Sequence, residues 1–468
     1  MGGTADITND AASLYRFVES IQTFCELQRG FPAYLEGSRV FLSLIEELSR
    51  STKKYSADFP AGLPTNSDDY RVYRQELRTL RYGWYYVHRF VKPIADADTL
   101  RLPGSLIDSL VRRLRSVESF GDSKLAILHI RELNYLQVIA SGVRETITQI
   151  SSFVGSSSSF PPDLGLIGIP YSQAKAVFLN SLIAHEIGHF VFEKRQLKDA
   201  LALKIHAILN STFAPVKDLV QKIGDSRRIP TTIADWSEEL FCDLFAVRFI
   251  GPCYSYAFIE IFDLTNYLSR DGSLDKDAAA LAVEFSYSHP AYLYRIQKQV
   301  EMLKSIGWWP HIRASQSTCQ KILENSESLG TSYFSFPFGS DLQKYFIDCL
   351  DQVLTEIRTA IEESLKGLDT GVAEYSRLSR TVKDYLLEGV VPSTIRDPDS
   401  GKRIVPETVT VLNSAYQLYL DDLPELIGRI EGQDAASVEH RAKWTETLEN
   451  WTLKALDDLA LISAKTGV

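Results

Sequence analysis

Hydrophobic residues recur every three or four positions along most of the chain, which is the spacing of one face of an α-helix. Leu14, Phe17, Val18 and Ile21 show this pattern near the start of the chain. The same spacing returns repeatedly as far as residue 150 and again over most of the last third of the sequence. The pattern therefore predicts a mainly α protein.

Three segments interrupt the helical pattern. Gly, Ser and Pro crowd residues 155–162, which is typical of a linker. The short apolar run Leu164–Ile169 follows and predicts a strand. Within 390–409, a strong turn signal at Asp397–Gly401 separates two β-branched runs, so we expect a β-hairpin there.

The length predicts more than one domain, because 468 residues exceed what a single hydrophobic core usually supports. With a boundary at the linker, we expect an N-terminal helical domain over 1–154, a core over 155–305 and a C-terminal helical region over 306–468. Hydrophobic residues make up 45% of the chain and charged residues 24%, which is ordinary for globular proteins and argues against global disorder.

The charge balance argues against nucleic acid as a partner. The formal net charge is −10 and the isoelectric point is near 5.4, whereas phosphate binding needs clustered Lys and Arg. The basic cluster around Arg112, Arg113 and Arg115 has the spacing of one solvated helix face. We therefore expect no nucleic-acid partner.

The chain has no membrane signal that these patterns detect. No apolar run reaches the ~18 residues that would span a bilayer, and the first residues lack the regions of a signal peptide. The five cysteines are odd in number and scattered, so they predict neither a disulfide framework nor a Cys-x-x-Cys zinc site. These features predict a protein of the reducing cytoplasm without a transmembrane segment.

The segment His185-Glu186-Ile187-Gly188-His189 has the pattern H-E-x-x-H in a predicted helix. Positions i and i+4 place both imidazoles on one face, where one Zn²⁺ at ~2.0–2.1 Å can reach both. Glu186 is adjacent to the first histidine and can act as a general base on a metal-bound water. Apolar neighbours predict a buried helix, in which three polar side chains need a common partner. We expect one Zn²⁺ per chain here.

A hydrolytic zinc site needs a third protein ligand and an open fourth position. The adjacent Glu238 and Glu239 compete for this role. With Asp235 as the expected N-cap of a helix, Glu238 completes a capping box and Glu239 is left for the metal. Asp243, one turn after Glu239, is expected to accept a hydrogen bond from a ligand histidine. Cys242 is interpreted as a small buried hydrophobic residue in preference to a thiolate ligand.

A third group of polar residues surrounds His289. Pro290 suits the first turn of a helix, and Ser288 is expected to be its N-cap. His289 then lies at the helix entrance, where it either stabilises an oxyanion in the transition state or only caps the helix. Tyr287 and Tyr292 are alternative donors.

These motifs come in the same order as in the gluzincin metallopeptidases. The chain most resembles the branch that contains the CAAX prenyl proteases and the heat-shock membrane proteases, in which H-E-x-G-H is followed by E-x-x-x-D and by an S/T-H-P segment with an Arg six residues after the His. The resemblance covers 165–300, about a third of the chain, and implies a zincin-like core. By its pattern, the ligands are His185, His189 and Glu239, the base is Glu186, and the supporting residues are Asp243, His289 and Arg295.

The chain departs from that branch in two ways. It lacks the transmembrane helices of the membrane members, so a prenylated or membrane-embedded substrate is not expected. Cys242 stands where the branch usually has Ala, which is a sterically mild change. The helical flanks resemble no family.

The predicted function is hydrolysis of a peptide bond in a protein or peptide substrate by a metal-activated water. The strand containing Ile167, Gly168 and Ile169 is expected to pair with the extended substrate by strand addition. The unexplained helical flanks suggest a regulatory partner and a latent enzyme. Two alternatives stay open, namely a non-catalytic zinc-containing interaction protein and a zinc hydrolase of a non-peptide amide or ester.

Overall fold

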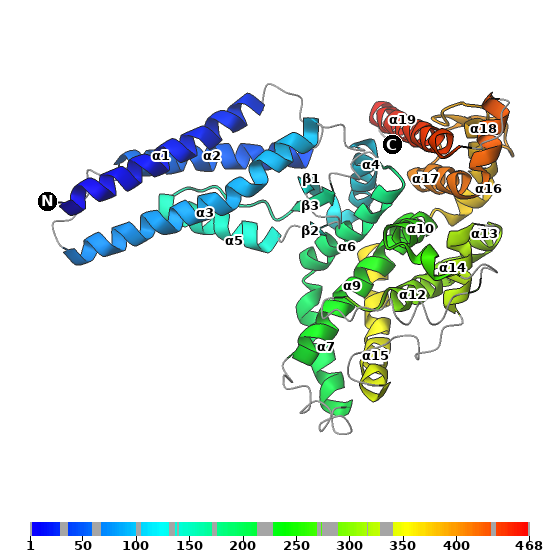
Figure 1. The fold of residues 1–468 in the computed structure, drawn as a ribbon, viewed down its shortest axis with the longest axis horizontal. Coiled ribbons are helices and arrows are strands. Elements are labelled where there is room, and N and C mark those ends of the chain that lie inside the picture. The colour runs from blue at the N-terminus through cyan, green and yellow to red at the C-terminus, as the bar shows by residue number, and fades with distance from the viewer. Residues whose placement is uncertain are drawn as a thin grey trace. The chain divides into compact units, whose positions relative to one another are not determined.

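The computed structural model is mainly helical (Figure 1), and the strands among its described residues form two small sheets, so the prediction of a mainly α protein is confirmed. The residues that the structure describes are 2–28, 36–58, 67–99, 104–130, 136–137, 140–170, 176–212, 228–268, 273, 289–315, 317–327, 340–431 and 437–466.

The chain forms two compact units, whereas three parts were expected. Unit 1 comprises Met1–Gly104 and Asp122–Lys175, and unit 2 comprises Ser105–Gly121 and Ala176–Val468. The expected boundary at the 155–162 linker differs from this division, because the strand that follows the linker pairs within unit 1. The expected division at residue 305 is not found either.

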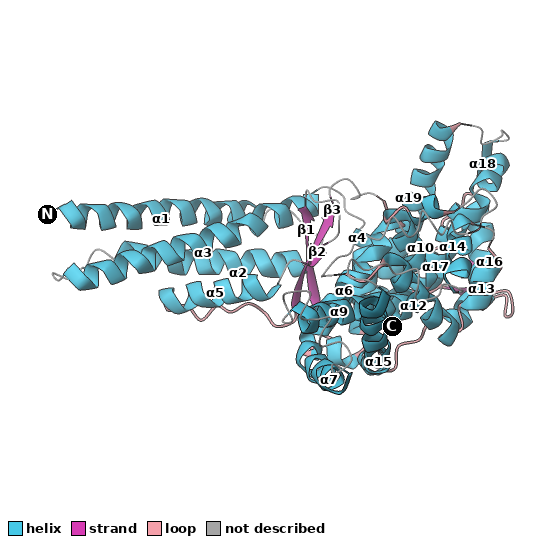
Figure 2. Cartoon of the chain, turned by 60° about the horizontal axis from the view of Figure 1, so that its bottom comes forward, coloured by secondary structure: helices cyan, strands magenta, loops and turns pink. Residues whose placement is uncertain are grey.

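The helices of unit 1 run side by side in both views (Figures 1 and 2). Their bounds are α1 Gly2–Gln28, α2 Glu36–Asp58, α3 Ser67–Thr99 and α5 Ala140–Val154. The apolar faces meet in a core that includes the fully buried Ile45 and Trp84. The indole N–H of Trp84 donates to the Thr52 hydroxyl at 3.1 Å, so this buried polar atom has a partner.

A three-stranded sheet completes unit 1, with the strand order β1-β3-β2. The strands are β1 Lys124–Ile130, β2 Leu136–Gln137 and β3 Leu164–Pro170. β3 pairs in parallel with β1, from Lys124 opposite Leu164 to Ile130 opposite Pro170, and antiparallel with β2. Gly37 of α2 lies against β1, since a Cβ there would fall 2.0 Å from the Leu125 carbonyl oxygen.

The predicted strand at Leu164–Ile169 is confirmed, and strand addition of a substrate there stays a prediction that the pairing of Ile167 and Gly168 disfavours. Ile167 pairs with Ile127 on one side and Gln137 on the other, and Gly168 is likewise paired on both sides. A peptide can add only to an unpaired edge. β3 is buried along its whole length, including Ile169.

Unit 2 holds the remaining elements. They are α4 Gly104–Arg115, η2 Glu118–Phe120, η4 Leu179–Leu182, α6 Ile183–Lys194, α7 Leu197–Thr212, α9 Arg228–Ile250, α10 Pro252–Ile261, η6 Leu264–Tyr267, α12 Tyr292–Ser305, α13 Trp309–Arg313, α14 Thr318–Glu327, α15 Ser340–Ser364, α16 Val372–Leu387, β4 Ile395–Arg396, β5 Arg403–Ile404, α17 Thr408–Gln417, the π-helical turn η8 Leu418–Asp422, α18 Leu423–Glu431 and α19 Val438–Thr466. The hairpin expected within 390–409 is confirmed, because Ile395 pairs with Ile404 and Arg396 with Arg403.

α9 is the central helix of unit 2 and packs against α6, α7, α12 and α15. Every residue from Leu240 to Ile250 is buried. Phe241, Phe245 and Phe249 stack along one side of it at successive ring-centroid distances of 6.0 and 5.3 Å. A helix that is apolar all round is one that lies inside a protein, so α9 can fix polar side chains rigidly.

The α4 segment is anchored in unit 2 by Arg113. Its Nε donates to the Phe249 carbonyl oxygen at the end of α9 at 2.8 Å, and its Nη1 lies 3.6 Å from Glu407 Oε2. The Arg113 side chain is only 10% exposed, and burial lowers its pKa to about 10. The solvated face expected for this arginine is therefore wrong, because its largely buried guanidinium hydrogen-bonds the Phe249 carbonyl at the end of α9.

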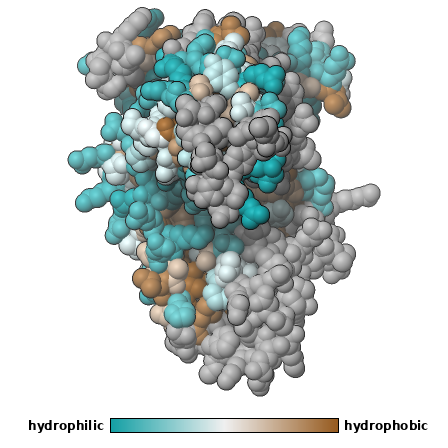
Figure 3. All heavy atoms as spheres, turned by 90° about the vertical axis from the view of Figure 1, so that its left-hand side faces the viewer, coloured by the Kyte–Doolittle hydropathy of each residue, from teal (hydrophilic) through white to brown (hydrophobic). Residues whose placement is uncertain are grey.

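Exposed hydrophobic side chains are scattered among polar ones in the described part of the chain. In the view of Figure 3, hydrophobic residues form small groups between hydrophilic ones. Single exposed side chains such as Leu203 and Val438 are normal on globular proteins. Among the described residues, no helix combines the length and the apolar composition needed to cross a bilayer.

The C-terminal helices contact the segment that leads into α6. Glu449 of α19 accepts the backbone N–H of Phe178 at 3.3 Å, and the Phe178 ring stacks on Tyr419 at 5.3 Å between centroids. Burial raises the pKa of Glu449 to about 7, although the backbone hydrogen bonds from Phe178 and Val177 oppose this rise. The C-terminal region is thus part of the unit that contains the histidine motif.

The raised pKa of Glu449 predicts that the free energy of unfolding falls as the pH rises. The unfolded carboxyl loses its proton near pH 4.5 and the folded one near 7, so the folded state binds more protons between these values and the free energy of unfolding falls as pH rises. We expect Glu449→Gln to remove this loss, with a stabilisation over wild type that grows to at most about 3 kcal/mol above pH 7. Urea unfolding at acidic and alkaline pH measures the difference, and an equal difference at both would contradict the prediction.

Candidate metal centre

The two helices that carry the candidate ligands, α6 and α9, touch at Gly188. A Cβ on Gly188 would lie 2.9 Å from Cys242 Cα and 3.1 Å from Cys242 Cβ, which is closer than real Cβ atoms come to backbone. Glycine therefore allows the two backbones to approach. This close packing brings the histidines of α6 next to the acidic residues of α9.

His185 and His189 lie on one face of α6 with ring centroids 4.9 Å apart. Their Nε2 atoms face the same carboxylate, since His185 Nε2 is 3.4 Å from Glu239 Oε2 and His189 Nε2 is 3.4 Å from Glu239 Oε1. In a tetrahedral zinc site with bonds of about 2.1 Å, two ligand atoms are about 3.4 Å apart. Each histidine Nε2 therefore lies from one Glu239 oxygen at the separation that two ligand atoms of a single zinc ion would have.

Asp243 is fully buried and contacts the other ring nitrogen of His185. Its Oδ1 lies 3.0 Å from His185 Nδ1, so the expected hydrogen bond between Asp243 and a histidine is present. Arg295 of α12 donates from Nε to Oδ2 at 2.6 Å and from Nη2 to Oδ1 at 2.8 Å. Burial raises the pKa of Asp243, but the Arg295 charge outweighs it and holds that pKa at about 2.

Glu238 contacts the second histidine, a role that the sequence analysis missed. Its Oε1 lies 2.9 Å from His189 Nδ1. The expected capping box is wrong, because α9 begins at Arg228 and Asp235 lies in its interior. Pro230 fits the first turn of this longer helix.

His289 and Arg295 both reach Glu239. His289 Nε2 lies 3.6 Å from Glu239 Oε1, and its side chain is 47% exposed. Arg295 Nη2 lies 3.2 Å from Glu239 Oε2. The N-cap of α12 is Ala291, so the N-cap expected at Ser288 is wrong, and Ser288 itself lies outside the described residues.

Of the two alternative donors, only Tyr292 is among the described residues. Tyr292 stacks on Phe262 at 4.2 Å between ring centroids, and Tyr287 lies outside the described residues. Ile167, Gly168 and Ile169 belong to unit 1, whereas the histidine cluster belongs to unit 2.

Tyr254 of α10 is another contact that the sequence did not indicate. Its hydroxyl donates to Asp243 Oδ1 and lies 3.2 Å from His185 Nδ1. Tyr254 and Asp243 are eleven positions apart, on two helices separated by Gly251. No helical spacing relates them, so only a predicted angle between α9 and α10 could have suggested the contact.

Cys242 offers a second donor set. One donor atom from each of His185, His189 and Cys242 lies within 4.8 Å of the other two. Burial raises the pKa of the Cys242 thiol to about 12, so a metal bound by this thiolate would have to displace its proton. Glu239 differs, because burial raises its pKa but the histidine hydrogen bonds and the Arg295 charge lower it well below its usual value.

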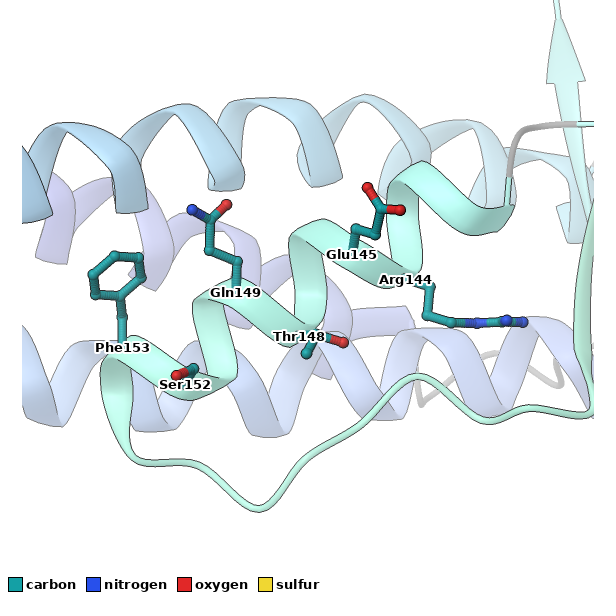
Figure 4. Close-up of a pocket in the computed structure, with 6 residues that line it drawn as sticks. All are labelled: Arg144, Glu145, Thr148, Gln149, Ser152 and Phe153. Carbon is teal, nitrogen blue, oxygen red and sulfur yellow. The ribbon is translucent and has the colours of Figure 1, made fainter.

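A hollow of about 530 Å³ on α5 is not a comparable site. Its lining side chains come from this one helix of unit 1 and are spread along it (Figure 4). They are Arg144, Glu145, Thr148, Gln149, Ser152 and Phe153. No metal-ligating group of the described residues gathers there.

Comparisons with family models, with curated proteins and with solved structures found no match. The resemblance to the gluzincins therefore depends on the order and spacing of the motif residues. The geometry around Glu239 is independent of that resemblance.

The close approach at Gly188 predicts a sharp effect of one methyl group. Gly188→Ala places a Cβ against the Cys242 backbone, so we expect α6 and α9 to separate, zinc binding to weaken and the protein to lose about 1–3 kcal/mol of stability. Gly428→Ala in α18 is the control, because a Cβ there meets nothing within 4 Å. Zinc titration and urea unfolding measure both effects, and unchanged zinc binding in Gly188→Ala would contradict the prediction.

Proposed function

We propose that this chain is a zinc-dependent peptidase in which His185, His189 and Glu239 hold the metal. The observation that carries the proposal is the placement of both Nε2 atoms 3.4 Å from the Glu239 carboxylate. These atoms are the free ring nitrogens, since the Nδ1 atoms already contact carboxylates. Two nitrogens and one carboxylate are the donor set of hydrolytic zinc sites of the His₂Glu type.

Zinc bound by three protein ligands would keep one position for water and would supply a Lewis acid that lowers the pKa of that water. Glu186 lies three residues before His189 on α6 and is buried. Its carboxylate can take the proton of the attacking water and pass it to the leaving amine. Because positions three apart share a helix face, Glu186 is on the side of the metal ligands.

His289 is the group suited to the substrate side of the site. Its side chain is half exposed, yet its Nε2 approaches Glu239. An N–H there can donate a hydrogen bond to the oxygen of the peptide carbonyl as negative charge develops on it. Arg295 cannot serve in this way, because its guanidinium is buried and paired with Asp243 and Glu239.

Cys242 supports a second candidate function. If the thiolate joined the two histidines and Glu239, the zinc would have four protein ligands and no open position. Such a closed site stabilises a fold without catalysis, as in an interaction or regulatory protein. The described cluster of His185, His189 and Cys242 is the observation that favours this alternative.

Three substitutions separate the candidates. We expect Glu186→Gln to keep zinc but lower the rate of peptide hydrolysis by about 10²–10⁴-fold, because it removes the base and leaves the ligands intact. Glu239→Gln should lose zinc, and Cys242→Ala should keep both zinc and activity. Metal analysis of purified protein and cleavage of an unbiased peptide library measure these outcomes.

The opposite pattern would favour the closed site. Zinc lost in Cys242→Ala, together with no cleavage by wild type, would contradict the peptidase. Zinc retained in Glu239→Gln would contradict Glu239 as a ligand. Cleavage of ester or non-peptide amide substrates alone would keep the zinc site and change the substrate class.

A further inference from the structure

We propose that Glu238 is a positioning residue that orients His189 for metal binding, as Asp243 orients His185. This inference rests on the metal site of the proposed function. The sequence pattern assigned Glu238 to a helix cap. Because α9 begins at Arg228, Glu238 lies inside the helix and does not cap it.

A carboxylate oxygen lies next to the outer nitrogen, Nδ1, of each histidine. His185 Nδ1 lies 3.0 Å from Asp243, and His189 Nδ1 lies 2.9 Å from Glu238. A carboxylate only accepts hydrogen bonds, so each neutral imidazole keeps its proton on Nδ1. The Nε2 lone pair of each ring is then directed at the metal position, as a ligand requires.

The adjacency of Glu238 and Glu239 on α9 explains how one helix does both tasks. Neighbouring helix positions point about 100° apart. The two carboxylates therefore reach opposite edges of the His189 ring, with Glu238 at Nδ1 and Glu239 at Nε2. The ring is fixed between them without a contribution from another helix.

The two positioning carboxylates differ in what else depends on them. Asp243 is fully buried and accepts hydrogen bonds from Arg295 and Tyr254, so its removal would take from the buried Arg295 guanidinium the partner of two of its hydrogen bonds and leave it only the ion pair with Glu239. The Glu238 side chain is 24% exposed, and no lysine or arginine of the described residues forms an ion pair with it. Glu238 can therefore be replaced without disturbing the fold.

The test compares zinc and cobalt binding by metal-free full-length protein. We expect Glu238→Ala to raise the zinc dissociation constant about 10–100-fold and to alter the visible d–d bands of bound Co²⁺, because His189 loses its orientation. Glu238→Gln keeps a carbonyl oxygen at the same place and should restore part of the affinity. Glu363→Gln removes one exposed carboxylate on α15 and should change neither value.

Each outcome decides the role. Wild-type affinity and an unchanged Co²⁺ spectrum in Glu238→Ala would overturn it, as would an equal loss of affinity in Glu363→Gln, which would indicate a general charge effect. If the wild-type protein binds neither zinc nor cobalt, the proposed metal site is contradicted, and so is the role of Glu238 that depends on it. Thermal unfolding of the metal-free variants checks that they fold, and the isosteric Glu238→Gln keeps the test valid if Glu238→Ala does not.

Discussion

The buried ion pair between Asp243 and Arg295 is the interaction on which the arrangement of the site depends. A carboxylate without solvent is costly unless its oxygens are saturated with hydrogen bonds. Asp243 meets this condition with donors from three helices, namely His185 of α6, Tyr254 of α10 and Arg295 of α12. All of these donors converge on one side chain of α9. The angles between the four helices are therefore fixed by the hydrogen bonds that the Asp243 carboxylate needs.

Arg295 extends this constraint to Glu239. Its Nη2 lies 2.8 Å from Asp243 and 3.2 Å from Glu239, so one guanidinium fixes both carboxylates of successive turns of α9. The same cation lies 4.9 Å from the Phe258 ring centroid, which gives it an apolar wall on its other side. The geometry at the histidines is therefore held by groups that do not themselves offer a donor to the metal.

Local spacing predicted the part of the site that lies on single helices. The i, i+4 relations of His185 with His189 and of Glu239 with Asp243 follow from helix geometry alone. The capping argument that favours Glu239 over Glu238 fails, because α9 begins at Arg228 and Asp235 is not its N-cap. The position of Glu239 between the two histidines supports the choice on other grounds. Tyr254 could not be predicted, because its contact depends on the crossing of two helices. The pairing of β3 with β1 could not be predicted either, because two strands forty residues apart leave no local sequence pattern that shows they pair.

The placement of α4 has a consequence for how the chain can be divided and made. The sequence passes from unit 1 into unit 2 at Ser105, returns at Asp122 and leaves again at Ala176. No single cut therefore separates the units, and a fragment that begins at Ala176 lacks the arginine that caps the end of α9. On the ribosome, Arg113 emerges long before Phe249 and Glu407, its partners in unit 2. Unit 2 can thus complete its packing only late in synthesis, after unit 1 has already left the exit tunnel.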